Sequence, residues 1–102
     1  MEKELEELIK IKIAISLRRL LESSKKHLKS NGEDIAQSYN QIAIVTGLRK
    51  GTVSDAFNAQ STPGSNTLIL IIESMGFNLI DFSKYYCSIG EKEINKFKTS
   101  IN

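Results

Sequence analysis

The side chains best suited to specific recognition stand close together near the middle of the chain, at Arg49, Lys50 and Asp55. Lysine and arginine only donate hydrogen bonds, whereas an ionised aspartate only accepts them. On a base pair, the two basic residues would suit the O6 and N7 acceptors of guanine, and Asp55 would suit the N4 amino group of cytosine. The alternative for Asp55 is a surface carboxylate that only repels DNA of non-cognate sequence, or one that pairs with a nearby cation.

Helical periodicity would hold these side chains on one exposed face. Val53 and Phe57 are spaced to predict the buried side of a helix. Gly51 lowers helix propensity but, lacking a side chain, would allow the helix N-terminus to approach a duplex closely. The residues left on the opposite, polar face are Lys50, Gly51, Ser54, Asp55 and Asn58.

A second short helix is predicted directly before this one. Ser38 can cap its first turn, and Gln41, three residues later, can reach back to complete a capping box. Ile42, Ala43 and Val45 are expected on its inward face. The helix therefore has a polar start signal and an apolar inner side.

A tight turn at Gly47 joins the two helices. Such a position often needs a left-handed backbone, which favours a residue without a β-carbon. The side chain of Leu48, next along the chain, is expected to pack into the core and anchor the turn. Two short helices joined in this way have the layout of a helix-turn-helix, whose second helix can enter the DNA major groove.

Residues 38–82 resemble the Cro/cI-repressor-like, XRE-type family of helix-turn-helix transcriptional regulators. Within the motif, the similarity rests on the small Ala43, the turn glycine Gly47, and the core positions Val53 and Phe57. Further on, the segments similar to the family's Pro loop, following helix and terminating glycine are Pro63, Asn66-Thr67-Leu68 and Met75-Gly76-Phe77.

The chain also departs from the family's pattern at three places. Arg49 stands where many members have a Ser or Thr cap, and Asn58-Ala59 stands where they often have Asn-Gly. The connection before the motif, which includes residues 30–34, is longer than the family's usual one.

The resemblance implies a DNA interface with two kinds of contact. Base contacts would come from the second motif helix, at Arg49, Lys50, Gly51, Thr52, Ser54 and Asp55. Phosphate contacts would come from the start of the first motif helix and the loop after the second, at Ser38, Tyr39, Asn40, Asn58, Ser61 and Ser65. For Tyr39, the structural alternative is a partly buried ring that covers the end of its helix.

The N-terminal region predicts one long helix over residues 2–28. Its core-facing stripe consists of Ile9, Ile13, Leu17, Leu20, Leu21 and Leu28. The apolar surface is widened by Leu5, Leu8, Ile11 and Ile15. We weigh two partners for this extra surface: another subunit, or the C-terminal segment of the same chain.

Positive charge is concentrated on this helix between residues 10 and 29, although the net charge of the chain is only +2. Helical spacing places the basic residues in two neighbouring rows, Arg18, Lys25 and Lys29 in one and Lys12, Arg19 and Lys26 in the other. The stripe could run beside DNA phosphates, or it could be a solvated outer face.

Further helices are expected after the motif. Pro63-Gly64 predicts a turn, after which Ser65 or Asn66 would cap a helix that ends at Gly76 with Phe77 as its hydrophobic partner. This helix is apolar nearly all round, which places it in the core or at a subunit interface.

A fifth helix is predicted over residues 79–86. Its packing groups would be Ile80, Phe82 and Tyr86, with a short strand as the alternative. Residues 88–102 are expected to be a polar, weakly helical tail. Cys87 is expected to be a small packing group, and His27 a solvated side chain on the long helix.

These elements predict an all-α fold: a five-helix, lambda-repressor-like DNA-binding domain with an extended N-terminal helix. We expect a single helix-turn-helix domain over residues 1–102. Its parts would be a long helix within 1–29, the motif over 38–58, C-terminal helices over 65–87, and the tail over 88–102.

Composition narrows the class of protein. One Cys and one His provide neither an internal disulfide nor a metal-ligand cluster, so no metal and no cofactor is expected. No apolar run approaches the roughly 20 residues of a membrane helix, and no signal peptide is recognisable. We therefore expect a cytoplasmic protein without membrane contact. The residues offer no catalytic constellation, so an enzyme is not expected.

The resemblance implies a sequence-specific transcriptional regulator that binds double-stranded DNA as a homodimer, most simply a repressor that blocks promoter access. Phage-type repressor and antitoxin roles both stay open. The alternative is a protein-protein interaction module, such as an antitoxin-like partner-binding protein, which would use the apolar N-terminal and fourth helices.

Overall fold

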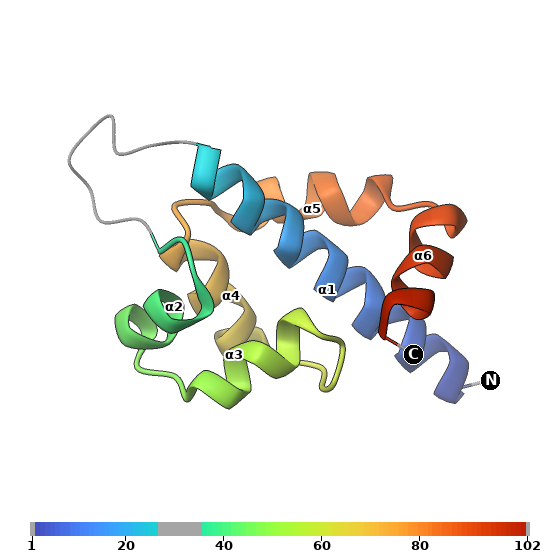
Figure 1. The fold of residues 1–102 in the computed structure, drawn as a ribbon, viewed down its shortest axis with the longest axis horizontal. Helices are drawn as coiled ribbons and strands as arrows, with labels where there is room; N and C mark the ends of the chain where they lie inside the picture. Colours follow the sequence, from blue (N-terminus) through green and yellow to red (C-terminus); the bar gives the residue numbers. More distant parts are fainter. Residues whose placement is uncertain (1, 27–35, 102) are drawn as a thin grey trace.

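The computed structural model describes residues 2–26 and 36–101. These residues form helices joined by turns and loops, and no strand (Figure 1). The fold is therefore all-α, with six helices in the described ranges where five were predicted. They are α1 (Glu2–Lys26), α2 (Tyr39–Thr46), α3 (Lys50–Phe57), α4 (Ser65–Ser74), α5 (Leu79–Ser88) and α6 (Glu91–Ile101). The predictions for His27, Leu28, Lys29 and residues 30–34 lie outside the described residues.

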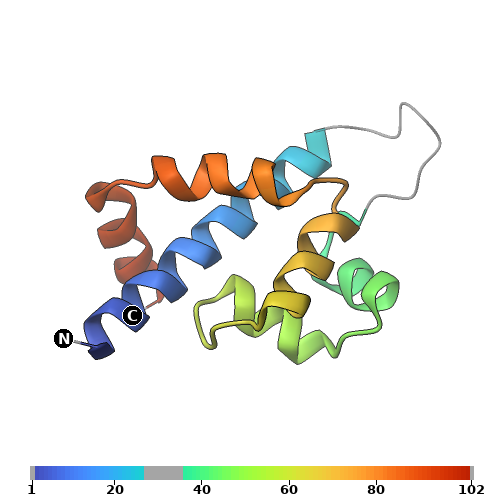
Figure 2. The ribbon, with the colours of Figure 1, turned by 180° about the vertical axis from the view of Figure 1, so that it is seen from behind.

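The long helix α1 is the centre of the fold. It packs against α3, α5 and α6, as the views from both sides show (Figures 1 and 2). Leu17 and Leu20 on α1 are fully buried in one apolar core with residues of α2, α3, α4 and α5. Each such side chain contributes about 1.5–3 kcal/mol of burial free energy, so α1 contributes strongly to the stability of the core.

Part of the extra apolar surface of α1 is covered by the same chain. Ile11 and Ile15 are buried in a second cluster together with Phe97 of α6. Leu5 and Ile9 stay exposed, at 58% and 40% of their surface, so the prediction that Ile9 is buried was wrong. The reason is length, because the first turns of α1 extend beyond α3 and α5 (Figures 1 and 2).

The sixth helix corrects the prediction of a polar tail. α6 carries Phe97, which is only 5% exposed, and Ile94 packs against the same cluster. Two apolar residues three positions apart are a weak periodic signal in the sequence. Their burial depends on α1, which lies far away along the chain.

The first motif helix, α2, begins as predicted but packs differently. Ser38 accepts a hydrogen bond from the backbone N–H of Gln41 at 3.1 Å. The Gln41 side chain accepts from the N–H of Gln37 at 2.6 Å and not from that of Ser38, so the predicted reciprocal capping box does not form. Val45 is 57% exposed, so its predicted inward position was wrong.

The inward stripe of α2 explains this exposure. Ile42 is fully buried, while Tyr39 and Ala43 are partly buried against the core. These three follow the i, i+3, i+4 rule of one helix face, which turns Ile44 and Val45 outwards. Ile44 is 72% exposed.

Helix α4 ends as predicted and starts differently. Gly76 has a φ of +86°, and its N–H donates to the carbonyl of Glu73 while that of Phe77 donates to the carbonyl of Ile72. This pair of bonds is a Schellman motif. At the other end Gly64 is the N-cap without a side-chain hydrogen bond, so neither Ser65 nor Asn66 is the cap.

Helix α5 has its own capping box, in which Asn78 and Asp81 exchange hydrogen bonds. The structure confirms the predicted helix and not the alternative of a short strand. Phe82 is buried, as expected. The prediction that Ile80 packs inwards was wrong, since it is 68% exposed. Cys87, expected to be a packing group, is also exposed.

In the described part of the chain, no helix is long and apolar enough to cross a membrane.

Candidate nucleic-acid interface

The two motif helices are held together by the predicted glycine turn. Gly47 has a φ of +78°, and its N–H donates to the carbonyl of Ala43 at 2.9 Å. Leu48 is partly buried against the main core, as expected. This geometry confirms the prediction of a left-handed glycine between α2 and α3.

The second motif helix, α3, is anchored by its buried side. Val53 and Phe57 are fully buried, which confirms the predicted inward face. On the other side, Lys50, Gly51 and Asp55 are exposed. The helix therefore presents one cation, one bare backbone position and one carboxylate on a rigid support.

The N-terminus of α3 is open to a ligand. Arg49 is the N-cap, has an extended backbone and makes no side-chain capping hydrogen bond. The first N–H groups of a helix lack intrahelical partners and carry the positive end of the helix dipole. Arg49 and Lys50, both exposed, add full positive charges at this end. An anionic group such as a phosphate would be favoured here.

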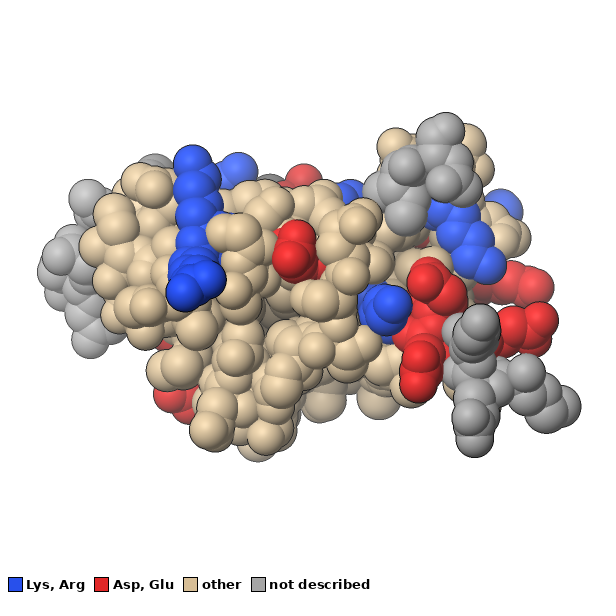
Figure 3. All heavy atoms as spheres, turned by 90° about the horizontal axis from the view of Figure 1, so that it is seen from below, with Lys and Arg blue, Asp and Glu red and all other residues tan. Residues whose placement is uncertain are grey.

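Charge is distributed unevenly over this side of the molecule. Figure 3 shows basic side chains at the end where α3 begins, and acidic side chains with further basic ones among them over the first turns of α1 at the opposite end. The acidic group includes the exposed Glu4, Glu6 and Glu7. The cations at the α3 end would attract a polyanion.

Two of the predicted contact residues face inwards. Asn58 donates to the Ser54 carbonyl at 2.8 Å and to the Ser54 hydroxyl at 3.2 Å. Its side-chain oxygen accepts from Arg18 at 2.7 Å. Both residues are half-buried, so the structure uses Ser54 and Asn58 to tie α3 to α1 and leaves Asn58 unsuited to the predicted phosphate contact.

The end of α3 also explains one departure from the family pattern. Ala59 has a left-handed backbone with a φ of +57°, where a glycine would be unstrained. The N–H of Gln60 donates to the carbonyl of Asp55 at 2.9 Å, which closes the helix. The methyl group of Ala59 is buried in the cluster with Ile11 and Phe97, so it gains packing that glycine lacks.

The remaining predicted phosphate contacts divide into two groups. Tyr39 stacks on Phe57 with ring centroids 4.6 Å apart and is half-buried, which is the structural alternative stated for it. Ser38 is occupied as the cap of α2. The residues exposed at the surface are Asn40, Ser61 and Ser65. Thr52 on α3 is half-buried.

Three residues of the predicted basic stripe on α1 have partners within the fold, while the side chains of Lys26 and Lys29 lie outside the described residues. Arg18 donates from Nε to the Phe57 carbonyl at 2.8 Å, and Arg19 forms an ion pair with Glu93. The Lys12 ammonium lies over the ring of Tyr86, 4.4 Å from its centroid. Lys25 is exposed. No local pattern indicates these partners, because they lie far away along the chain.

Among residues 2–26 and 36–101, no group of three or more His, Cys, Asp and Glu side chains could hold a metal ion. Comparisons with known protein families, with curated proteins and with solved structures found no match for this chain. The geometry and charge of α2 and α3 are therefore the features of the molecule that bear on its function.

Proposed function

We propose that this protein is a sequence-specific DNA-binding transcriptional regulator with a lambda-repressor-like domain, acting as a homodimer with α3 in the major groove. One observation carries the proposal: α3 follows a left-handed glycine turn, is anchored by the fully buried Val53 and Phe57, and exposes Lys50 and Asp55 at its surface. This is the arrangement by which a helix-turn-helix reads base edges.

The exposed residues of α3 and its N-cap would each make a different contact with DNA. Lys50 would donate to a guanine, and Asp55 would accept from a cytosine amino group. Gly51, whose added β-carbon would meet nothing within 4 Å, lets the start of α3 approach the duplex. Arg49 would contact a phosphate or a base near the groove wall, helped by the open helix N-terminus.

A homodimer follows from the small size of the reading element. α3 has eight residues, which is about 12 Å of helix, so one copy contacts few base pairs. A second copy would place another α3 about 34 Å away on the same face of the duplex. The exposed apolar residues that would supply a dimer surface on α4 and α5 are Ile69, Leu70, Leu79 and Ile80. Binding over a promoter would then repress transcription by blocking access.

A second candidate function, a protein-interaction module, is favoured by Ile44 and Val45. These residues are 72% and 57% exposed on α2 and would suit a protein partner. The N-terminal helix offers less than the sequence indicated, because α6 covers Ile11 and Ile15. An interaction module would therefore rely on α2 and α4.

Selection of bound duplexes from a random pool tests the two candidates. A DNA reader that works as a homodimer should enrich a motif with two-fold symmetry, with half-sites about one helical turn apart. Binding of all duplexes with equal affinity, and no enriched motif, would refute the proposal and favour the interaction module. A Val45→Ser variant serves as a control, because it removes exposed apolar surface without adding charge. Val45 has no base contact in the proposed complex, so this variant should bind DNA like the wild type.

A further inference from the structure

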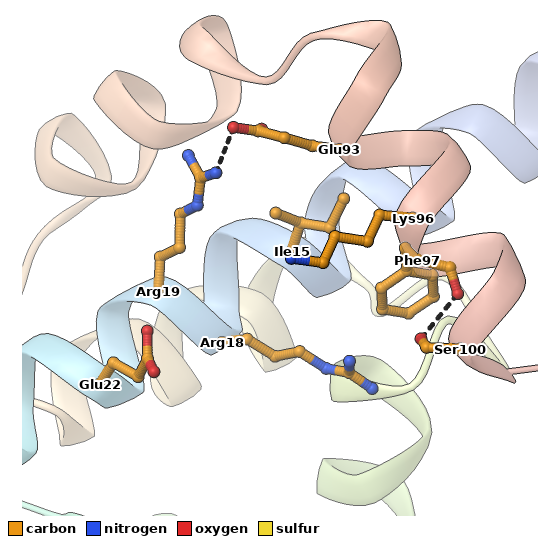
Figure 4. A pocket seen from close by; sticks show the side chains of 8 residues that line it. All are labelled: Ile15, Arg18, Arg19, Glu22, Glu93, Lys96, Phe97 and Ser100. Atoms are coloured by element: carbon orange, nitrogen blue, oxygen red, sulfur yellow. Dashed lines mark hydrogen bonds and ion pairs between the residues drawn. The ribbon is translucent and has the colours of Figure 1, made fainter.

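A depression between α1 and α6 is separate from the proposed DNA-binding face. Its volume is about 410 Å³, within the range of small-molecule sites. Five charged side chains line it, namely Arg18, Arg19, Glu22, Glu93 and Lys96. Figure 4 shows that they come from the facing sides of the two helices and surround a common space.

The floor of this depression is apolar. Ile15 and Phe97 line it and are only 8% and 5% exposed. The guanidinium of Arg18 lies over the Phe97 ring, with Cζ 4.5 Å from the centroid. A ligand with an apolar part would therefore find a surface to cover, below a rim of charged groups.

The charges on the rim are of both signs. Three cations face two carboxylates, and Arg19 is already paired with Glu93. Only one oxygen of Glu93 is used: Oε2 is buried and has no hydrogen-bond partner among the described residues. A buried acceptor without a partner is destabilising, so a donor from a ligand would be stabilising here.

The Glu93 carboxylate has room to meet such a donor. Its side chain is 36% exposed, although Oε2 itself is buried, so a ligand's donor would reach Oε2 after the carboxylate turns about its soft terminal torsion. Across the same space, the exposed Lys96 offers an ammonium group that no ion pair occupies in the described part of the chain. The site thus pairs an acceptor in need of a donor with a free cation.

We propose that this depression binds a small zwitterion of the amino-acid class. The ligand's ammonium group donates to Glu93, its carboxylate pairs with Lys96, and its apolar side chain covers Ile15 and Phe97. Neither an anion alone nor a cation alone satisfies both ends of the site. The proposal commits to a free amino acid, with an apolar side chain that fits the volume.

Arg18 connects the depression to the end of α3. It lines the site, and it also donates to the Phe57 carbonyl and to Asn58. Ligand binding is therefore expected to change the amide signals of Phe57 and Asn58. Where the DNA-binding proposal holds, the depression would be an effector site; that step rests on the proposed function, while ligand binding itself needs no DNA.

The test uses L-phenylalanine as the probe in amide NMR titrations of the whole protein. Two truncated probes complete the set: 3-phenylpropionate, which lacks the ammonium group, and 2-phenylethylamine, which lacks the carboxylate. L-phenylalanine should give saturable shifts in α1, α6 and Asn58. Each truncated probe should bind about tenfold more weakly, as expected for the loss of one charged hydrogen bond.

Variants assign the two ends of the probe. Glu93→Gln keeps an oxygen for Arg19 but removes the charge, so it should weaken L-phenylalanine about tenfold and leave 3-phenylpropionate unchanged. Lys96→Gln should weaken both of these probes and leave 2-phenylethylamine unchanged. Lys98→Gln, an exposed residue of α6 outside the lining, is the matched control and should bind like the wild type.

Three results would overturn the proposal. The first is an absence of saturable shifts at probe concentrations well above about 1 mM. The second is equal or tighter binding of 3-phenylpropionate, which would make the depression an organic-acid site. The third is unchanged binding of L-phenylalanine by folded Lys96→Gln; this residue is exposed, so its variant remains informative even if Glu93→Gln fails to fold.

Discussion

The Arg18 guanidinium donates from Nε to the backbone carbonyl of Phe57 at 2.8 Å. This bond joins the middle of α1 to the last residue of α3. A second bond, from Nη2 to the Asn58 side chain, reinforces it. A cation that the sequence suggested for DNA phosphates thus fixes the position of the helix proposed to read DNA.

Removing this guanidinium should destabilise the fold. Arg18→Met keeps the apolar stem but leaves the Phe57 carbonyl without its donor, so the free energy of unfolding should fall by about 1–3 kcal/mol. Urea denaturation measures the change. Lys25→Met on the exposed side of the same helix should stay within about 0.5 kcal/mol of the wild type. Equal effects of the two substitutions would contradict the anchoring role.

The two glycines of the motif should respond to alanine with opposite signs. Gly47→Ala meets no atom within 4 Å, but its φ of +78° is strained for alanine, at a cost of about 1–2 kcal/mol. Gly51→Ala lies in open space in a helix, so helix propensity should raise stability by about 0.5–1 kcal/mol. Thermal denaturation of both variants checks this pair, and a stabilised Gly47→Ala would refute the turn assignment.

Phe97 should hold α6 on α1. Phe97→Ala removes a buried ring from the second cluster, and the expected loss is about 3–5 kcal/mol. Hydrogen exchange should show faster exchange in α6 while α2 and α3 remain protected, because Phe97 lies outside the main core. Phe97→Leu should give a smaller effect. Unchanged exchange in α6 would mean that this helix does not depend on the cluster.

The proposed dimer should be sensitive to Ile80. Ile80→Glu places an unpaired charge on exposed apolar surface at the start of α5, and should weaken self-association at least about tenfold. Ser88→Glu at the far end of α5 controls for the added charge. Sedimentation equilibrium distinguishes monomer from dimer, and a dimer unaffected by Ile80→Glu would place the interface elsewhere.

Local patterns predicted the features that depend on nearby residues. The burial of Val53 and Phe57 and the left-handed Gly47 follow from helical spacing and from glycine's backbone freedom. The errors at Val45 and Ile80 arose in helices with apolar residues on more than one side, where the sequence does not indicate which side meets the core.

Features that depend on distant residues were not predictable. Arg19 and Glu93 are 74 residues apart, so neither their ion pair nor the depression beside it leaves a local pattern. For the same reason, the sequence indicates for the basic residues of α1 only a stripe beside phosphates or a solvated outer face. Arg18, Lys12 and Arg19 instead find partners on α3, α5 and α6.

The most direct test of the DNA-binding proposal compares Lys50→Gln with Lys98→Gln in anisotropy titrations on the selected duplex and on a scrambled one. The account predicts that Lys50→Gln loses about 1–3 kcal/mol of binding free energy on the selected duplex and most of its preference over the scrambled one. Lys98→Gln should retain both. If Lys50→Gln binds both duplexes as the wild type does, α3 is not the reading element and the central claim fails.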